Sequence, residues 1–223
     1  MPDTMTGALA EAIHRVGYAD AASVPLLETP ACARLTREAR ALCYRPARPV
    51  VGSGETAVHQ DFDLATEIPV GGLTALARVL DRHIRGALTS MNRNPLPDGF
   101  AINDLIVQRY AAGSAGITPH RDHIRYTGLV AIVVLAGAGR FFISQDRTGG
   151  DVREIPAPPG HLLLMRAPGF NGRNDRPFHA VRDITAERYI IGLRCDSRPD
   201  RSSVAPEDAP EVSPNTPCRP AGP

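Results

Sequence analysis

The chain has 223 residues, of which 43% are apolar and 22% are charged, and its formal net charge is +1. This size and apolar content fit one globular domain, and the small net charge excludes strong electrostatic recruitment to nucleic acid or to a membrane surface. All 25 basic residues are arginine. Because lysine is absent, enzymes that depend on a Schiff-base lysine, a P-loop lysine or a kinase lysine are excluded.

The first 100 residues are predicted to form a helical N-terminal region that packs on the rest of the chain. Apolar residues recur at helical spacing in 6–16, in 31–43 and most clearly in 73–91. Residues 44–70 lack this period and are predicted to be loop or irregular strand.

The N-terminus shows neither the basic nor the apolar region of a signal peptide, and no apolar run reaches membrane-spanning length. The four cysteines include no C-x-x-C pair. We therefore expect a cytoplasmic protein with reduced thiols and no membrane partner.

Residues 101–195 consist of short β-branched segments that glycine and proline turns separate. The predicted strands are 102–110, 117–121, 128–136, 140–145, 151–155, 161–166, 178–183 and 188–195. Short strands at close spacing favour a sandwich or barrel. The predicted fold is thus mainly β within the α+β class, a double-stranded β-helix (jelly roll) core backed by N-terminal helices. Residues 196–223 include seven prolines and few apolar side chains, which predicts a disordered tail.

The histidines supply the candidate metal ligands. Two of them begin a His-x-acid pair, His59–Asp61 and His120–Asp122, but only the second pair lies at a predicted strand, where residues i and i+2 share a face. His179 begins another β-like segment and is the best third ligand. Two histidines and one carboxylate form the facial triad of non-haem iron oxygenases. The alternative is that these histidines are hydrogen-bonded strand residues, and His120–Asp122 by itself favours that alternative.

The last predicted strand places Arg188 and Arg194 six residues apart, and therefore on one face. Gly192 lies between them on that face, and a glycine in a strand often marks the close approach of a ligand. Arginines in an interior need anionic partners, and a guanidinium binds a carboxylate through two parallel hydrogen bonds. A dicarboxylate that also chelates a metal would suit this site. The alternative is that both arginines are solvated on an exposed face of the strand. The opposite, apolar face would then be the only buried face.

Together these motifs resemble the AlkB-like family of iron(II)- and 2-oxoglutarate-dependent dioxygenases over roughly residues 102–195. That family carries Asn-x-Tyr on a strand, then His-x-Asp, a distal histidine and Arg-x5-Arg. The matching residues in this chain are Gln108, Tyr110, His120, Asp122, His179, Arg188 and Arg194. The order is the same, and the 56 residues between the His-x-Asp aspartate and the distal histidine suit this barrel.

The resemblance implies that the His-x-Asp pair and the distal histidine bind iron(II), with 2-oxoglutarate and O2 as cosubstrates. Arg188 would hold the distal carboxylate of 2-oxoglutarate with help from Tyr110, and Arg194 would lie near the proximal carboxylate and the metal. Gln108 stands where the family usually has asparagine, and its longer amide would still reach the cosubstrate. The implied reaction is hydroxylation of a C–H bond.

Three features favour a small-molecule substrate over nucleic acid. The chain has no tryptophan to stack a flipped base, residues 1–195 carry a net charge of only +3, and Ile124 and Arg125 stand where nucleic-acid-demethylating members often carry acids. His123 and Arg125 are the weak candidates for substrate contact. The alternatives are oxidative demethylation of alkylated DNA or RNA bases, a non-catalytic AlkB-like binding protein, and a cupin-like metal site in which His123 replaces Asp122.

Overall fold

The structure, a computed structural model, describes residues 4–149 and 151–198. Its α-helices are α1 (Thr4–Ala19), α2 (Thr29–Arg40) and α3 (Gly72–Thr89). Its strands are β1 (Ala21–Pro25), β2 (Arg45–Pro46), β3 (Val50–Val51), β4 (Val58–Asp61), β5 (Asp63–Ala65), β6 (Asp104–Tyr110), β7 (Gly116–His120), β8 (Tyr126–Ser144), β9 (Arg153–Glu154), β10 (His161–Arg166) and β11 (Phe178–Asp196). Two short 3-10 turns complete the list, η1 (Gly54–Thr56) and η2 (Phe170–Gly172).

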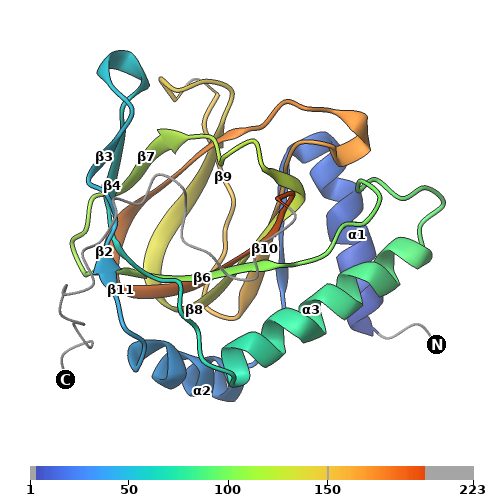
Figure 1. Ribbon diagram of the computed structural model, residues 1–223, viewed down its shortest axis with the longest axis horizontal. Helices are drawn as coiled ribbons and strands as arrows, with labels where there is room; N and C mark the ends of the chain where they lie inside the picture. The colour runs from blue at the N-terminus through green and yellow to red at the C-terminus, as the bar shows by residue number, and fades with distance from the viewer. Residues whose placement is uncertain (1–3, 150, 199–223) are drawn as a thin grey trace.

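The strands form a rolled antiparallel sheet with the main order β1-β10-β8-β11-β6-β5-β2. The second half of β11 pairs with β6, whereas its first half pairs with β7, which continues into β4 and β3. Figure 1 shows β3, β4 and β7 on the upper side of the roll and α2 and α3 along the lower side. The prediction of a mainly-β jelly-roll core backed by N-terminal helices is confirmed.

Alternate residues of β11 face two different hydrophobic cores. Tyr189, Ile191 and Leu193 pack in the core between the sheet and the helices, which is built largely from α1, α2, α3 and the outer face of the sheet. Ile190 packs in a second core inside the roll. Because both faces of the central strands are buried, their sequences are nearly continuous apolar runs rather than alternating ones. The interior face is the one that carries the candidate site.

The roll depends on a bend where β8 and β11 change register. The register between the two strands shifts on both sides of the Ala186–Ala138 pair. Gly137 lies at this bend with a φ of +85°, and a Cβ there would collide with the backbone of Glu187, so glycine is required for the close approach. Two residues on, the Gly139 carbonyl accepts a hydrogen bond from Arg188 Nη1 at 2.8 Å. The bend therefore also fixes the position of this arginine.

The predicted helices are confirmed to within a few residues, and the strand predictions need correction. Segments 128–136 and 140–145 form the single strand β8, and 178–183 and 188–195 form the single strand β11. The glycine-rich and charged residues between them make register shifts instead of turns. The N-terminal region contributes strands as well as helices, since β1 pairs with β10, and β2 and β5 extend the sheet from β6.

The expected domain boundaries stay predictions. Residues 199–223 of the expected tail lie outside the described residues, while Asp196 is the last residue of β11 and is buried.

Cys32 and Cys195 are free, as predicted, but Cys43 is disulfide-bonded, so the prediction of reduced thiols is wrong for it. Within the described residues, none of the helices has the length and apolar character that crossing a bilayer requires. The cytoplasmic location stays a prediction.

Candidate functional site

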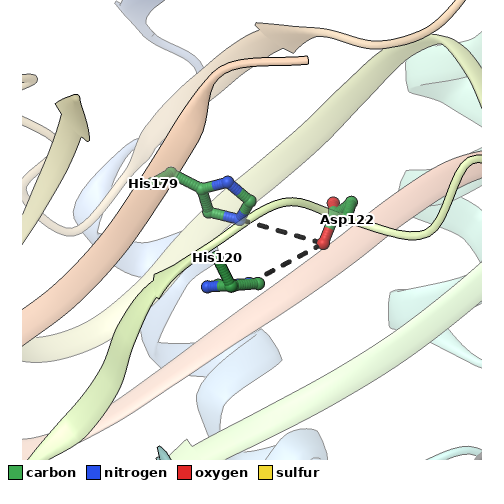
Figure 2. Close-up of side chains that lie close together, drawn as sticks. All are labelled: His120, Asp122 and His179. Atoms are coloured by element: carbon green, nitrogen blue, oxygen red, sulfur yellow. Dashed lines mark ion pairs between the residues drawn. The ribbon is translucent and has the colours of Figure 1, made fainter. Parts of the chain in front are cut away.

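The three predicted metal ligands converge inside the roll. His120 ends β7, His179 lies opposite it in register near the start of β11, and Asp122 lies in the loop that follows β7. Asp122 Oδ1 is 3.9 Å from His120 Nε2 and 3.8 Å from His179 Nε2 (Figure 2). One ligand atom from each residue lies within 4.8 Å of the others. Because β7 stops at His120, the loop and not strand alternation brings Asp122 into the site.

Both histidines are poised to offer a lone pair rather than a proton. His120 Nδ1 lies 3.0 Å from the Thr118 carbonyl oxygen, which only accepts, so Nδ1 carries the proton and Nε2 is left unprotonated. Burial lowers the pKa of His120, and burial together with the neighbouring His120 lowers the pKa of His179 to about 3. Both rings are therefore neutral near pH 7, as metal ligation requires.

Arg194 holds the carboxylate of Asp122 from the side opposite the histidines. Its Nε is 3.7 Å from Asp122 Oδ2, and its Nη1 donates to Asp104 Oδ2 at 3.2 Å. Burial, the largest single effect, raises the pKa of Asp122, but the combined effects of Arg194, the two histidines and Arg176 bring the pKa below its usual value. Asp104 was not predicted from the sequence, because one acid in an apolar strand does not indicate its partner. In the structure it lies directly opposite Arg194 in register.

This set of donors fits an iron(II) ion. Two neutral imidazole nitrogens and one ionised carboxylate oxygen face a common point, which is the ligand composition of the facial triad. In the described residues, this cluster contains Asp122 and not His123, which disfavours the cupin-like alternative. The exposed His59 lies on β4 and does not join the cluster.

Arg188 is a buried cation without a carboxylate partner in the described residues. Its exposed fraction is 2%, and one nitrogen donates to the Gly139 carbonyl while Nε has no hydrogen-bond partner. Burial lowers the pKa of the guanidinium. A buried charge is costly unless an opposite charge compensates it. The second arginine of the motif differs, because Arg194 already has two carboxylates beside it. The alternative of two solvated arginines is wrong.

Tyr110 and Gln108 lie beside Arg188 on the interior face. Tyr110 is directly opposite Arg188 on the neighbouring strand β6, and its hydroxyl donates to Gln108 Oε1 at 3.1 Å. Gly192 was expected to mark the close approach of a ligand, but protein side chains fill the space beside it. A Cβ at this position would lie 3.2 Å from Ile106 and 3.4 Å from the Arg194 guanidinium. Gly192 thus makes room for Arg194 itself.

The triad and Arg188 line one cavity of about 250 Å³. Its walls combine apolar side chains of the roll with many polar and charged ones, and six of the lining residues are arginines. The cavity brings together all of the residues predicted from the sequence: Gln108, Tyr110, His120, Asp122, His123, Arg125, His179, Arg188 and Arg194.

The two weak candidates for substrate contact differ in their surroundings. His123 is exposed, and its Nδ1 accepts a hydrogen bond from the backbone N–H of Arg125 at 3.2 Å. Arg125 is buried, its Nε lies 3.3 Å from Asp196 Oδ2, and it donates to the Tyr126 hydroxyl. Asp196 thus compensates the charge of Arg125. Contact of His123 and Arg125 with the substrate stays a prediction.

The depressed pKa of His179 predicts that the metal-free protein loses stability in acid. The folded pKa of about 3 lies below the ordinary histidine pKa of 6.5, so between these values the unfolded chain binds more protons and falling pH favours unfolding. By pH 4.5 the cost is about 2–3 kcal/mol. Urea unfolding at pH 7 and pH 4.5 should show a larger loss for the wild type than for His179→Gln. A His59→Gln control should behave as the wild type, and equal losses in wild type and His179→Gln would contradict the prediction.

No protein-family model and no curated protein matches the chain. Solved structures do match its fold. A prolyl hydroxylase from Trichoplax adhaerens, in complex with a hypoxia inducible factor peptide fragment, superposes with a TM-score of 0.63 and 14% identity over 86% of this chain and 90% of that chain. An oxidoreductase of the 2OG-Fe(II) oxygenase family from Burkholderia pseudomallei superposes with a TM-score of 0.59 and 16% identity. The match covers 88% of this chain and 94% of that chain.

A third match is SnoN, a non-heme alpha ketoglutarate dependent epimerase from nogalamycin biosynthesis. Its TM-score is 0.57 at 18% identity, over 85% of this chain and 84% of that chain. At such low identities the matches establish the fold, which is the one these oxygenases share. The narrower resemblance to AlkB-like proteins stays a prediction that rests on the order of the sequence motifs.

Proposed function

We propose that the protein is an iron(II)- and 2-oxoglutarate-dependent dioxygenase that hydroxylates a C–H bond of a small molecule. The observation that carries this proposal is one cavity that contains both the His120–Asp122–His179 cluster and Arg188, a buried cation with no acidic partner in the described residues. The metal ligands alone would suit many metalloenzymes. The additional uncompensated cation calls for a carboxylate ligand, which 2-oxoglutarate provides.

The three metal ligands, the two arginines of the Arg-x5-Arg motif, Tyr110 and Gln108 have roles in this proposal. His120, Asp122 and His179 hold the iron, and Arg194 keeps one oxygen of Asp122 directed at the histidines by binding the other. When bound, iron(II) supplies activation of O2 coupled to oxidative decarboxylation of 2-oxoglutarate to succinate and carbon dioxide.

The distal carboxylate of 2-oxoglutarate binds Arg188. The guanidinium is held in place by the Gly139 carbonyl, so it is pre-oriented before the ligand arrives. Tyr110, opposite Arg188, keeps its hydroxyl on Gln108 and lies within reach of the same carboxylate. The apolar walls of the roll exclude water from the reacting groups.

A small-molecule substrate is proposed because the site is a cavity walled by strands on both sides. The absence of tryptophan supports the same choice, since no indole is present to stack an extruded base. The AlkB-like motif order keeps oxidative demethylation of nucleic-acid bases as the second candidate, because Gln108, Tyr110 and the paired arginines follow that pattern.

We expect the anaerobically iron-loaded protein to convert 2-oxoglutarate to succinate when oxygen is admitted. Succinate should be measured with a panel of small metabolites and, separately, with methylated DNA and RNA oligonucleotides at matched low salt. A member of the metabolite panel should raise the rate above the substrate-free background, and the oligonucleotides should release little formaldehyde. The zinc-loaded protein is the control, because zinc binds similar ligands but has no redox chemistry.

Two results would argue against the proposal in different ways. Failure of the iron-loaded protein to bind or consume 2-oxoglutarate would reject the dioxygenase function as a whole. Efficient demethylation of an oligonucleotide, with a rate that falls steeply as salt rises, would reject only the small-molecule substrate and favour nucleic-acid repair.

A further inference from the structure

Apart from Arg125, which lies beside Asp196, the cavity wall carries three arginines that the proposed reaction does not use. Arg45 follows α2 on strand β2, Arg48 lies just before β3, and Arg121 lies between two of the metal ligands. In residues 4–149 and 151–198, no carboxylate lies within ion-pair distance of any of them. Arg121 has another contact, because its guanidinium stacks 4.1 Å from the ring centroid of Phe178. Arg45 and Arg48 have no such contact in the described residues.

The side chain of Arg45 belongs to the interior face of the roll. Arg45 is directly opposite Leu64, Leu64 is opposite Gln108, and Gln108 is opposite Ile190, so the four lie in one cross-strand row from β2 to β11. All four line the cavity, as expected for residues that share a face of the sheet. Arg45 thus closes the far end of the row, three strands and roughly 14 Å of backbone from β11.

One nitrogen of Arg45 is a buried donor without an acceptor. Nη2 has no hydrogen-bond partner in the structure and is shielded from solvent, and burial lowers the pKa of the guanidinium. Most buried polar groups in folded proteins are hydrogen-bonded, so an orphaned charged donor that lines a cavity indicates a missing ligand atom. Arg48, three residues later, is exposed at the same cavity and adds a second positive charge.

2-Oxoglutarate cannot supply that ligand atom. In the proposed function, one of its carboxylates binds Arg188 and the other binds at the metal, so neither is left for the opposite end of the row. The protein's own acids are also committed, since Asp104 and Asp122 lie beside Arg194, and Asp196 lies beside Arg125. The buried nitrogen of Arg45 therefore needs an acceptor from another ligand, and the charge of the exposed Arg48 nearby favours an anionic one.

We propose that Arg45 and Arg48 bind an acidic group, a carboxylate or a phosphate, of the substrate. This inference rests on the proposed function and adds the chemical class of its substrate. The strands that follow Arg45 and Arg48 also contribute apolar side chains to the cavity lining, namely Val51, Val58 and Phe62. The substrate is thus a small molecule with an apolar body and an acidic end. The acid binds at β2, and the apolar body extends toward the metal ligands on β7 and β11.

The test measures anion binding to protein that is saturated with 2-oxoglutarate, so that Arg188 is already occupied. Isothermal titration calorimetry is run with hexanoate and inorganic phosphate, and with methyl hexanoate as the uncharged match. We expect hexanoate or phosphate to bind at millimolar concentration or below and the ester to bind at least tenfold more weakly than its acid. The preferred anion identifies the acidic group as carboxylate or phosphate.

The arginine variants locate the binding site. Arg45→Gln should weaken binding of the preferred anion at least tenfold. Arg45→Lys should retain part of the affinity, because an ammonium keeps the charge but cannot form two parallel hydrogen bonds. Arg48→Gln should weaken binding less than Arg45→Gln. Arg34→Gln is the matched control, since it removes one exposed charge on α2, away from the cavity. Arg48 is exposed, so its variant also keeps the test valid if Arg45→Gln does not fold.

Several outcomes would overturn the inference. These are equal binding of acid and ester, no binding of either anion to the wild type, and equal losses of affinity in Arg34→Gln and in the cavity variants. Single-stranded oligothymidine is titrated in parallel. If the cavity variants weaken only its binding, the arginines bind nucleic acid instead. The initial titration with 2-oxoglutarate separates the two proposals. Binding of 2-oxoglutarate without anion binding rejects only this inference, whereas absence of 2-oxoglutarate binding rejects the proposed function.

Discussion

Replacing Asp122 with alanine is expected to lower iron(II) affinity at least about 100-fold and to abolish succinate formation. Asp122 is the only anionic member of the cluster, and both histidine Nε2 atoms lie closest to its Oδ1. Loss of a group that merely orients a ligand typically costs 10–100-fold in metal affinity, so loss of the charged ligand itself should cost more. Metal content after anaerobic loading and desalting, measured by mass spectrometry, gives the readout.

Two histidine variants outside the proposed metal site are the controls for this experiment. His123→Ala removes a ring beside the site, and His59→Ala removes the histidine of the other His-x-acid pair. Neither belongs to the cluster in the described residues, so both should keep the wild-type metal content. Retention of metal in Asp122→Ala with loss in His123→Ala would instead support a site made of three histidines.

Replacing Arg188 with alanine is expected to weaken 2-oxoglutarate binding about 100-fold while leaving metal content nearly unchanged. The guanidinium is buried and faces no protein carboxylate in the described residues, so the ligand makes a shielded charge pair with it. Such a pair contributes about 2–3 kcal/mol, which corresponds to roughly 100-fold in affinity. Arg188→Lys should restore only part of the affinity, because an ammonium cannot form two parallel hydrogen bonds to one carboxylate.

The matched control is Arg182→Ala, which removes an arginine from the same strand. The Arg182 side chain is exposed and lies 3.9 Å from Asp183, so 2-oxoglutarate affinity should not change. Calorimetric titration of the metal-loaded variants with 2-oxoglutarate is the measurement. An unchanged dissociation constant in Arg188→Ala would show that the cosubstrate carboxylate binds elsewhere, and Arg45 would be the next cation to test.

Local sequence patterns predicted the secondary structure well wherever one period dominated. The segment 73–91 keeps its apolar residues on one helical face, and the structure forms α3 there. The patterns were less informative at β8 and β11, because a glycine-rich segment such as Gly137–Gly139 is typical of a turn and also of a bend within one strand. Only the pairing of β8 with β11 shows that the chain continues through it.

The candidate metal ligands could be identified from sequence because their types and spacing are chemically restrictive. The order of a His-x-Asp pair, a distal histidine and an Arg-x5-Arg strand resembles the AlkB-like pattern, and the even spacing of Arg188 and Arg194 placed both on one face without knowledge of the fold. Arg45 and Asp104 offered no comparable signal. In a chain with 25 arginines and 24 acidic residues, a single charge in a short strand gives no indication of its partner or of its burial.

The sequence by itself determined the class of fold, the candidate ligands and the chemistries that a chain without lysine excludes, because these follow from residue type and from local periodicity. Only the tertiary structure decided which charges compensate one another. Arg194 has Asp104 and Asp122 beside it, whereas Arg188 and Arg45 face a cavity without an acid of their own in the described residues. Ion pairing depends on distances across strands far apart in the chain, which spacing along the sequence does not specify.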